Sequence, residues 1–265
     1  MKYSDFAGII FDVDDTLLDN DTGNEHGGLH ARSRLEAFHE VGRRHNIPEM
    51  IDLGVERCRN GWRLSRVHSL EGAVWATLFD LGVVDSPEID HANKLLREIT
   101  EYKDEIHEAV LREYGLEVPG ASAFVRSLAE HGFRERMAIA STAVRRDIMI
   151  FLEKTNLKQF FPDERIISKE MVTHLKPHPE VFDRAFASLG LPESDRARVL
   201  AFEDDPRGVA SAKAAGLTVF VITTNHTSEG FGNGEAQPDF IADSFAAFRE
   251  YLVLPDALLV SSSQE

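Results

Sequence analysis

The sequence has little of several features that direct a protein to particular partners or compartments. Its 265 residues include one cysteine, Cys58, so no disulfide can form within the chain, and a reducing cytoplasm is the expected location. No apolar run is long enough to span a bilayer. The start, MKYSDFAGIIF, has an acidic residue before its apolar run and no small-residue cleavage site. We therefore expect neither a membrane anchor nor a signal peptide.

Basic residues are also scarce. The chain has 29 Lys and Arg against 45 Asp and Glu, which gives a formal net charge of −16. A surface this acidic repels the phosphates of nucleic acids and anionic lipids, so neither is an expected partner. If the substrate is itself an anion, cations at the site must reverse this field locally. Nothing in the composition indicates the oligomeric state.

From about residue 117 onward, short apolar runs alternate with segments of helical spacing. Strands that alternate with helices predict a mostly parallel sheet covered on both faces. GIIFD (8–12) fits as a further central strand of this sheet. The other expected strands are MAIAS (137–141), ERIIS (164–168), RVLAFED (198–204), GLTVFVIT (216–223) and PDFIAD (238–243). The expected helices between them lie in ASAFVRSLAEHG, AVRRDIMIFLEKTN, HPEVFDRAFASLG and PRGVASAKAAG.

Residues from about 22 to 114 follow a different pattern, with helical spacing and no convincing strand. The helical segments are HARSRLEAFHEVGRRH, LEGAVWATLFDLG and EIDHANKLLREITEYKDEIHEAVLREYG. Pro119 and Gly120 end the last of these helices. We therefore predict an α/β protein in which an all-helical domain (21–116) is inserted into a core with a Rossmann-like parallel sheet. The core would comprise residues 1–20 and 117–260, followed by a frayed tail at 261–265.

The stretch AGIIFDVDDTLLDND (7–21) ends a buried strand in carboxylates. An apolar run reaches Phe11, and five aspartates follow within ten residues. In an open parallel sheet the active crevice lies at the carboxyl ends of the strands. The polar residues expected to meet there are Asp12, Asp14, Ser141, Thr142, Lys176, Glu203, Asp204 and Asp205. Clustered carboxylates repel one another unless a cation joins them, and oxygen ligands with room for water suit Mg²⁺. The sequence therefore predicts a magnesium site that acts on a phosphate.

Four segments resemble the four motifs of the haloacid dehalogenase superfamily, in the same order. DVDDT (12–16) resembles its DxDxT signature. AIAST (138–142), LKPHPEVF (175–182) and AFEDDPRGVASAKAAG (201–216) resemble its second, third and fourth motifs. The helical insert after the first motif is similar to the C1-type cap of the β-phosphoglucomutase and phosphoglycolate phosphatase branch. With the sheet between them, the motifs cover about two thirds of the chain.

The resemblance implies a role for each motif residue. Asp12 is implied to be the nucleophile that forms an aspartyl phosphate, and Asp14 to protonate the leaving oxygen and then activate water. Lys176 would neutralise charge on the nucleophile and on the transferring group. Thr16, Ser141 and Thr142 are implied to contact the phosphate. The implied Mg²⁺ site consists of Asp12, the backbone carbonyl of Asp14, Asp204 and Glu203. Within it, Glu203 would orient water or Lys176. Asp205 stands where the branch often has serine.

Three of these motifs also have a simpler interpretation. Asp12 and Asp14 fit a turn that follows a strand, since aspartate favours turns. Ser141 and Thr142 fit the N-cap of a helix over AVRRDIMIF. Lys176 fits an exposed loop. All three interpretations weaken because the four motifs occur together and in order.

Several other polar residues fit structural roles. Asp205 fits a helix cap better than a metal or phosphate contact. His26 and His30 have helical spacing, but the glycines between them argue against a zinc-binding helix. His174 and His178 flank Lys176 and fit loop and cap duties.

The predicted cap contains one basic segment, RCRNGWRLSRVHSL (57–70), which has four arginines and no acidic residue. The simpler interpretation is a solvated helix face whose arginines pair with acids elsewhere. The alternative is that Arg63 or Arg66 binds a substrate group remote from the transferring phosphate.

Together these features predict a two-domain, Mg²⁺-dependent phosphatase acting on a small phosphorylated metabolite. Asp14 favours a phosphate ester, because a dehalogenase has no leaving oxygen to protonate. A phosphomutase of the β-phosphoglucomutase kind would use the same core residues and stays an alternative. A non-catalytic binding protein on the same fold is a second alternative, for which loss of Asp12, Asp14 or Lys176 would be the mark.

Overall fold

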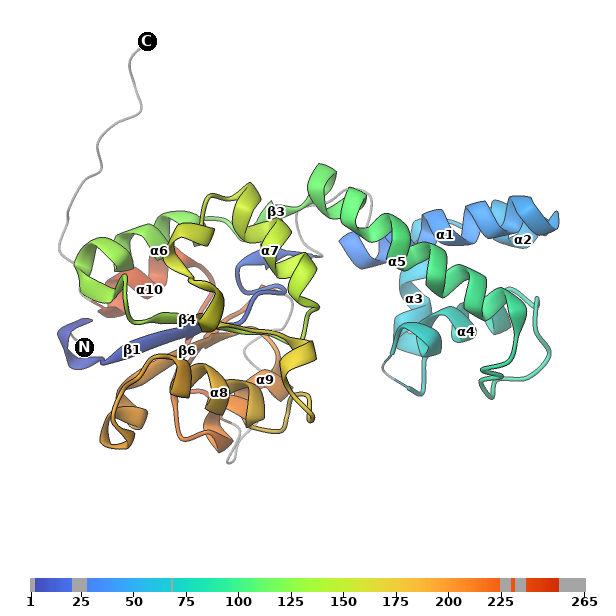
Figure 1. Cartoon of the computed structure of the whole chain (residues 1–265). Helices are drawn as coiled ribbons and strands as arrows, with labels where there is room; N and C mark the ends of the chain where they lie inside the picture. The colour runs from blue at the N-terminus through green and yellow to red at the C-terminus, as the bar shows by residue number, and fades with distance from the viewer. Residues whose placement is uncertain (1–2, 21–27, 68, 225–229, 232–236, 253–265) are drawn as a thin grey trace, which may run out of the picture. The chain divides into compact units, whose positions relative to one another are not determined.

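The chain forms two compact units, described here by a computed structural model of residues 3–20, 28–67, 69–224, 230–231 and 237–252 (Figure 1). One unit comprises Met1–Asp19 and Glu117–Glu265, and the other comprises Asn20–Leu116. The predicted tail at 261–265 lies outside the described residues. Within the described ranges, no helix combines the length and the apolar character needed to cross a membrane.

The first unit is built on a six-stranded, all-parallel sheet with the strand order β5-β4-β1-β6-β7-β8. The strands are β1 (Gly8–Phe11), β4 (Met137–Ala140), β5 (Ile166–Ile167), β6 (Val199–Glu203), β7 (Thr218–Ile222) and β8 (Phe240–Ala242). Every residue of β1, β4 and β6 is buried, which is typical of a parallel sheet with helices on both faces. The predicted Rossmann-like core is confirmed. A separate two-stranded sheet consists of β2 (Leu18–Asp19) and β3 (Leu116–Glu117).

Helices cover both faces of this sheet (Figure 1). They are α6 (Ala121–Leu128), α7 (Arg145–Lys154), α8 (Glu180–Ser188), α9 (Pro206–Ala214) and α10 (Phe245–Leu252). On one face, α8 and α9 bury apolar side chains such as Phe182 and Val209 against the strands. On the other face, Phe202 stacks on Phe11 at 5.0 Å between ring centroids and meets Phe124 of α6 at 5.3 Å. The strands that carry the motif residues at their ends are therefore held in a tightly packed core.

The second unit is all-helical, as predicted for the insert. Its helices are α1 (Leu29–His45), α2 (Pro48–Ile51), α3 (Val55–Leu64), α4 (Leu70–Asp80) and α5 (Lys94–Tyr114). Buried side chains such as Phe38, Leu78 and Ile99 form a separate apolar core within this unit. Side chains cap two of the helices: Ser69 accepts the N–H of Gly72 at the start of α4, and Asn93 caps α5 in the same way.

The strand predicted at 164–168 is shorter in the structure. Only Ile166–Ile167 pair with β4, because Asp163–Arg165 forms a 3₁₀ turn immediately before them. The edge position explains the difference, since this strand has only one neighbour to pair with.

Candidate active site

Asp12 lies at the carboxyl end of the central strand. Phe11 is in register with Ile139 of β4 on one side and with Phe202 of β6 on the other. The N–H of Asp12 donates to the Phe202 carbonyl at 2.9 Å, so the parallel pairing reaches the aspartate itself. The residues that follow β4 and β6 therefore emerge at the same sheet edge as Asp12.

The loop after Asp12 turns back tightly. The carbonyl of Val13 accepts the N–H groups of Leu17 and Leu18, both at 2.8 Å, and Asp15 adopts a left-handed φ of 58°. Asp14 is half-buried in this loop. Thr16 is fully buried, and its Oγ1 donates a hydrogen bond to Asp204 Oδ1 at 3.2 Å. The first and fourth motifs are thus joined directly by this bond.

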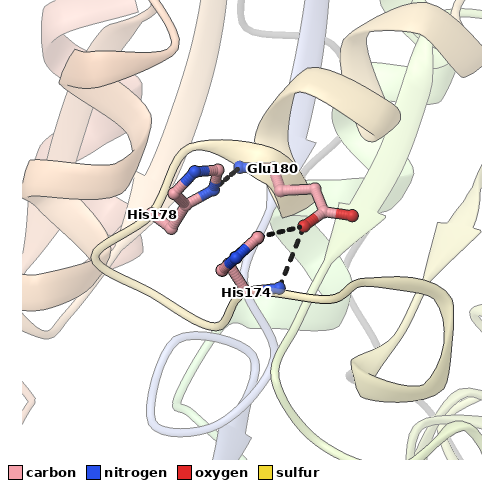
Figure 2. Close-up of side chains that lie close together, drawn as sticks. All are labelled: His174, His178 and Glu180. Atoms are coloured by element: carbon pink, nitrogen blue, oxygen red, sulfur yellow. Dashed lines mark hydrogen bonds and ion pairs between the residues drawn. The ribbon is translucent and has the colours of Figure 1, made fainter.

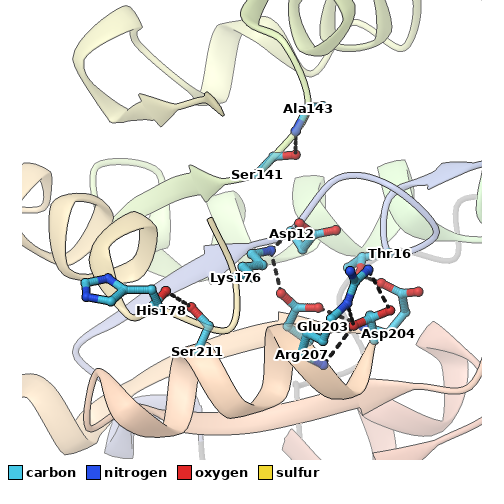
Figure 3. Close-up of polar contacts among 11 residues, drawn as sticks. Asp12, Thr16, Ser141, Ala143, Lys176, His178, Glu203, Asp204, Arg207 and Ser211 are labelled. Carbon is cyan, nitrogen blue, oxygen red and sulfur yellow. Dashed lines mark hydrogen bonds and ion pairs between the residues drawn. The ribbon is translucent and has the colours of Figure 1, made fainter. Parts of the chain in front are cut away.

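Lys176 places its ammonium group between two carboxylates (Figure 3). Its Nζ donates to Asp12 Oδ1 at 2.5 Å and to Glu203 Oε1 at 2.6 Å, and all three side chains are at least nine-tenths buried. Burial alone would lower the pKa of Lys176, but attraction to Asp12 and Glu203 outweighs it and raises the pKa above its ordinary value. Lys176 therefore stays charged at neutral pH. The simpler interpretation of an exposed loop lysine is wrong.

Negative charge exceeds positive charge in this cluster. Burial raises the pKa of Asp12 well above its ordinary value; Lys176 opposes the rise, and repulsion from Glu203 adds to it. The pKa of Asp204 is also raised well above its ordinary value, first by burial and then by repulsion from Glu203 and Asp12. Burial raises the pKa of Glu203 as well, against the attraction of Lys176. The cluster contains three buried carboxylates and one ammonium group, which contacts only Asp12 and Glu203, so a further cation would relieve the repulsion.

The donors of this cluster fit a hard divalent cation. Asp12, Glu203 and Asp204 each offer one carboxylate oxygen within 4.8 Å of the others. Oxygen-only ligand sets of this kind suit Mg²⁺. The Asp14 carboxylate is not part of this group. The family resemblance implies that Asp14 binds the metal through its backbone carbonyl instead.

Glycine at position 208 makes room for Glu203. A Cβ at this position in α9 would lie 2.1 Å from both Cδ and Oε2 of Glu203, so no larger residue fits beside the carboxylate as it stands. The Oε2 atom also accepts the N–H of Asp204 at 3.2 Å. Sequence analysis did not single out Gly208, because only the fold brings α9 against the end of β6.

Comparison with known proteins agrees with this geometry. A family model described as haloacid dehalogenase-like hydrolase matches residues 6–216, which include all four motifs. The chain belongs to the haloacid dehalogenase-like hydrolases. It is 28% identical over 196 residues to glycerol-1-phosphate phosphohydrolase 1 of Saccharomyces cerevisiae, a match that covers 66% of this chain and 72% of the yeast protein. It is 26% identical to the probable phosphatase IndB of Dickeya dadantii, over 96% of both chains.

A solved structure of a HAD hydrolase, family IA, variant 3 from Entamoeba histolytica has the same fold. The TM-score is 0.68 at 19% identity, and the match covers 96% of this chain and 99% of that one.

Ser141, in the second motif of this haloacid dehalogenase-like hydrolase, is buried directly after β4. Its Oγ accepts the N–H of Ala143 at 3.1 Å and so fixes the loop that also contains Thr142. Neither residue caps the following helix, so that simpler interpretation is wrong. The N-cap of α7 is Val144, which makes no capping bond through its side chain. The first N–H of the helix, that of Arg145, donates instead to the Glu170 carboxylate at 3.0 Å.

Asp205 caps α9 in the fourth motif. Its Oδ1 accepts the N–H of Arg207 at 2.7 Å, and the Arg207 guanidinium group lies against the same carboxylate, with Nε at 3.2 Å. The structure therefore favours the capping interpretation of Asp205. Arg207 places a cation beside the cluster that sequence analysis had not singled out.

The cap arginines divide into two pairs. Arg57 pairs with Asp80 at 2.5 Å and Arg59 with Glu56 at 3.5 Å, so the solvated-face interpretation holds for these two. Arg63 and Arg66 are exposed and make no ion pair with any described residue. Their contact with substrate stays a prediction.

His26 and His30 were considered as a zinc-binding pair in the sequence. The His30 ring stacks on that of His107, and His26 lies outside the described residues.

Proposed function

We propose that the protein is a Mg²⁺-dependent phosphatase that hydrolyses the monoester of a small phosphorylated metabolite through an aspartyl phosphate on Asp12. The observation that carries the proposal is the Lys176 ammonium group, which bridges Asp12 and Glu203 in a buried, carboxylate-rich cluster. An ammonium group held against a nucleophilic carboxylate offsets the charge that gathers when a phosphate dianion approaches. Phosphoryl transfer depends chiefly on such positioning and neutralisation.

In the first step, an Asp12 carboxylate oxygen attacks phosphorus. The bond from phosphorus to the ester oxygen breaks, and the leaving oxygen takes a proton from the Asp14 carboxyl group. Asp14 suits this task because it is half-buried in the loop directly after the nucleophile. Lys176 stays protonated and holds Asp12 in place.

In the second step, the Asp14 carboxylate removes a proton from water, and the resulting hydroxide attacks the phosphorus of the aspartyl phosphate. The bond from phosphorus to Asp12 breaks, which releases inorganic phosphate and restores both aspartates. Ser141 and Thr142 are expected to bind phosphoryl oxygens during both steps. Mg²⁺, held by Asp12, Asp204 and the Asp14 carbonyl with support from Glu203, would supply positive charge to the phosphoryl oxygens.

The relatives support a small phosphomonoester as substrate. The yeast relative is a glycerol-1-phosphate phosphohydrolase, and the Dickeya relative is a probable phosphatase. Both names fit a site in which Asp14 protonates an alcohol leaving group. We therefore propose a phosphorylated polyol, sugar or comparable metabolite as the substrate class.

A metabolite screen tests the proposal. The purified chain is incubated with a panel of phosphomonoesters in the presence of Mg²⁺, and release of inorganic phosphate is measured. Asp12→Asn serves as the matched control, because it removes the nucleophile and keeps the shape of the side chain. We expect phosphate release from at least one ester by the wild type and none by the variant. Equal release by both proteins would overturn the assignment of Asp12.

A further inference from the structure

The loop that carries Lys176 also carries three metal-ligating side chains. Lys176 points inward to Asp12, whereas His174 and His178 are exposed. Glu180, in the first turn of α8, follows two residues after His178. Both histidines and the glutamate therefore lie outside the buried contact between Lys176 and Asp12.

Figure 2 shows that the two imidazole rings converge on Glu180. His174 Nδ1 lies 3.2 Å from Glu180 Oε2, and His178 Nδ1 accepts the Glu180 N–H at 3.2 Å. The ring centroids are 4.5 Å apart. One ligand atom from each residue lies within 4.8 Å of the other two.

The Glu180 carboxylate is held in a fixed position. It accepts the N–H groups of His174 at 2.9 Å and Thr173 at 3.1 Å, and Arg184 reaches it from the next helical turn at 2.9 Å. These bonds, the two backbone ones foremost, lower the pKa of Glu180 to about 2. The carboxylate therefore stays charged at any pH at which histidine is neutral.

We propose that His174, His178 and Glu180 form a binding site for a divalent transition-metal ion of the Zn²⁺ class, separate from the carboxylate cluster around Asp12. Two imidazole nitrogens and one carboxylate oxygen are ligands that Zn²⁺ prefers, whereas Mg²⁺ prefers oxygen alone. Ligand atoms around a tetrahedral zinc ion at its usual bond lengths lie about 3.3 Å apart. The 3.2 Å between His174 Nδ1 and Glu180 Oε2 meets this spacing, and rotation of the exposed His178 ring completes the set.

The proton balance of binding is simple. His174 Nδ1 faces a carboxylate oxygen, which favours the tautomer of the neutral ring that has its proton on Nδ1. On binding, the Nδ1 lone pair goes to the metal and the ring carries its proton on Nε2 instead, exchanged through solvent. No redox step or further reactant is needed.

A metal ion at this site would fasten the loop on either side of Lys176. His174 precedes the lysine by two residues and His178 follows it by two, so their joint ligation closes a short chelate around it. The His178 carbonyl already accepts a hydrogen bond from Ser211 Oγ of α9 at 2.7 Å. Occupancy would therefore restrict the backbone from which the catalytic ammonium group extends.

Cobalt binding tests the site directly. The full chain is stripped with a chelator and titrated with Co²⁺ in excess Mg²⁺, which saturates the carboxylate cluster, while visible absorption reports nitrogen-ligated Co²⁺. We expect a single equivalent to bind. Loss of even an outer-shell partner lowers metal affinity about 10–100-fold, so His174→Gln and His178→Gln should each weaken binding by about tenfold or more.

His91→Gln is the matched control. His91 is an exposed histidine whose Nδ1 lies 2.9 Å from Glu71, but it belongs to neither of the metal-ligating groups found among the described residues. This variant should bind Co²⁺ like the wild type, and so should Asp204→Asn, which alters the carboxylate cluster. Hydrogen exchange at residues 173–180 should slow when Co²⁺ is added to the wild type, but not in the His174→Gln/His178→Gln double variant.

Two results would overturn the proposal. One is Co²⁺ affinity in the double variant equal to that of the wild type, and the other is no Co²⁺ binding by the wild type in excess Mg²⁺. If Co²⁺ binding left hydrogen exchange at residues 173–180 unchanged, the inference that the metal restricts the Lys176 loop would be wrong. Circular dichroism of the exposed-residue variants confirms that each remains folded.

Discussion

Lys176 Nζ lies 2.5 Å from Asp12 Oδ1, although 164 positions separate the two residues in the chain. The same ammonium group contacts Glu203, so one lysine holds two carboxylates that would otherwise repel each other. Strand β1 can be followed by the buried Asp12 because the third motif brings the Lys176 ammonium group to its carboxylate. The contact therefore bears both on the stability of this edge of the sheet and on the charge of Asp12, the proposed nucleophile.

Lys176→Met should destabilise the protein and stop turnover. Removal of one partner from a buried ion pair leaves uncompensated charge and costs about 3–5 kcal/mol. We expect a loss of this size in the free energy of unfolding in chelating buffer at neutral pH, measured by urea denaturation. Lys169→Met, at an exposed lysine before the same loop, should leave stability nearly unchanged. Equal unfolding free energies for the two variants would show that the bridge contributes nothing.

The raised carboxyl pKa values predict a dependence of stability on pH and Mg²⁺. Between the ordinary aspartate pKa of about 4 and the raised pKa of Asp204, the folded state binds more protons than the unfolded state. In EDTA, this carboxyl group therefore makes stability fall as pH rises above the ordinary aspartate pKa of about 4. Mg²⁺ should reverse that fall, because it favours the ionised form, and EDTA should also abolish turnover.

Urea denaturation at several pH values, with and without Mg²⁺, measures this dependence. Histidines also titrate in the same range, so the informative quantity is the difference between the wild type and Asp204→Asn. The variant should gain stability relative to the wild type as pH rises in EDTA. If the unfolding free energies of the two proteins changed with pH in parallel, the proposed excess of negative charge in the carboxylate cluster would be contradicted.

Thr16→Val should weaken Mg²⁺ binding without unfolding the protein. Valine keeps the shape of the buried side chain but removes the hydroxyl group that donates to Asp204. Loss of a hydrogen bond to a metal-ligating carboxylate lowers metal affinity about 10–100-fold. The measurement is the Mg²⁺ concentration for half-maximal activity, with Thr16→Ser as the control that keeps the hydroxyl group. An identical Mg²⁺ requirement in all three proteins would mean that the bond does not position Asp204.

Gly208→Ala should destabilise the protein, against the usual helix preference. Alanine in a helix interior is normally favoured over glycine by about 1 kcal/mol. Here the added Cβ meets the Glu203 carboxylate at 2.1 Å, so Glu203 or α9 must move, at a cost of about 1–3 kcal/mol. Turnover should fall too, since a displaced Glu203 no longer shares Lys176 with Asp12. Gly54→Ala is the control, because a Cβ there meets no atom within 4 Å.

The sequence predicted the central sheet well, because each buried strand is a short apolar run between helical segments. Parallel pairing then dictates that residues after β1, β4 and β6 share one edge. Three features were not predictable. Edge strand β5 is cut to two residues by a 3₁₀ turn. The fit of Gly208 to Glu203 and the bond from Thr16 to Asp204 depend on tertiary packing, which leaves no local pattern in the chain.

The short helices of the insert were also missed. α2 has four residues and α3 ten, too few for a clear period. α3 contains three of the four arginines of the basic segment and ends at Leu64, so Arg63 lies in its last turn and Arg66 beyond it. The role of these two arginines stays a prediction.

Arg63→Ala or Arg66→Ala should raise KM for the natural substrate. Both side chains are exposed, and no described acid neutralises either one, so each is available to an anionic group of a ligand. Loss of a charged hydrogen bond of about 1.5–3 kcal/mol raises KM roughly tenfold or more. A small aryl phosphate lacks the remote group, so its KM should hardly change. Arg57→Ala is the matched control, because Asp80 already pairs with that arginine.

A second arm of this experiment tests which cations of the helical unit (Asn20–Leu116) bind the remote group of the substrate. Arg34 and Lys103 are cations of the same unit, only 5% and 8% exposed. If Arg63→Ala and Arg66→Ala leave both substrates unaffected while Lys103→Met raises KM for the natural substrate alone, the buried cations bind the remote group and the exposed arginines are a solvated face. If only the arginine variants raise KM, the basic segment recognises the substrate, because an exposed guanidinium group grips a carboxylate or phosphate through two parallel hydrogen bonds.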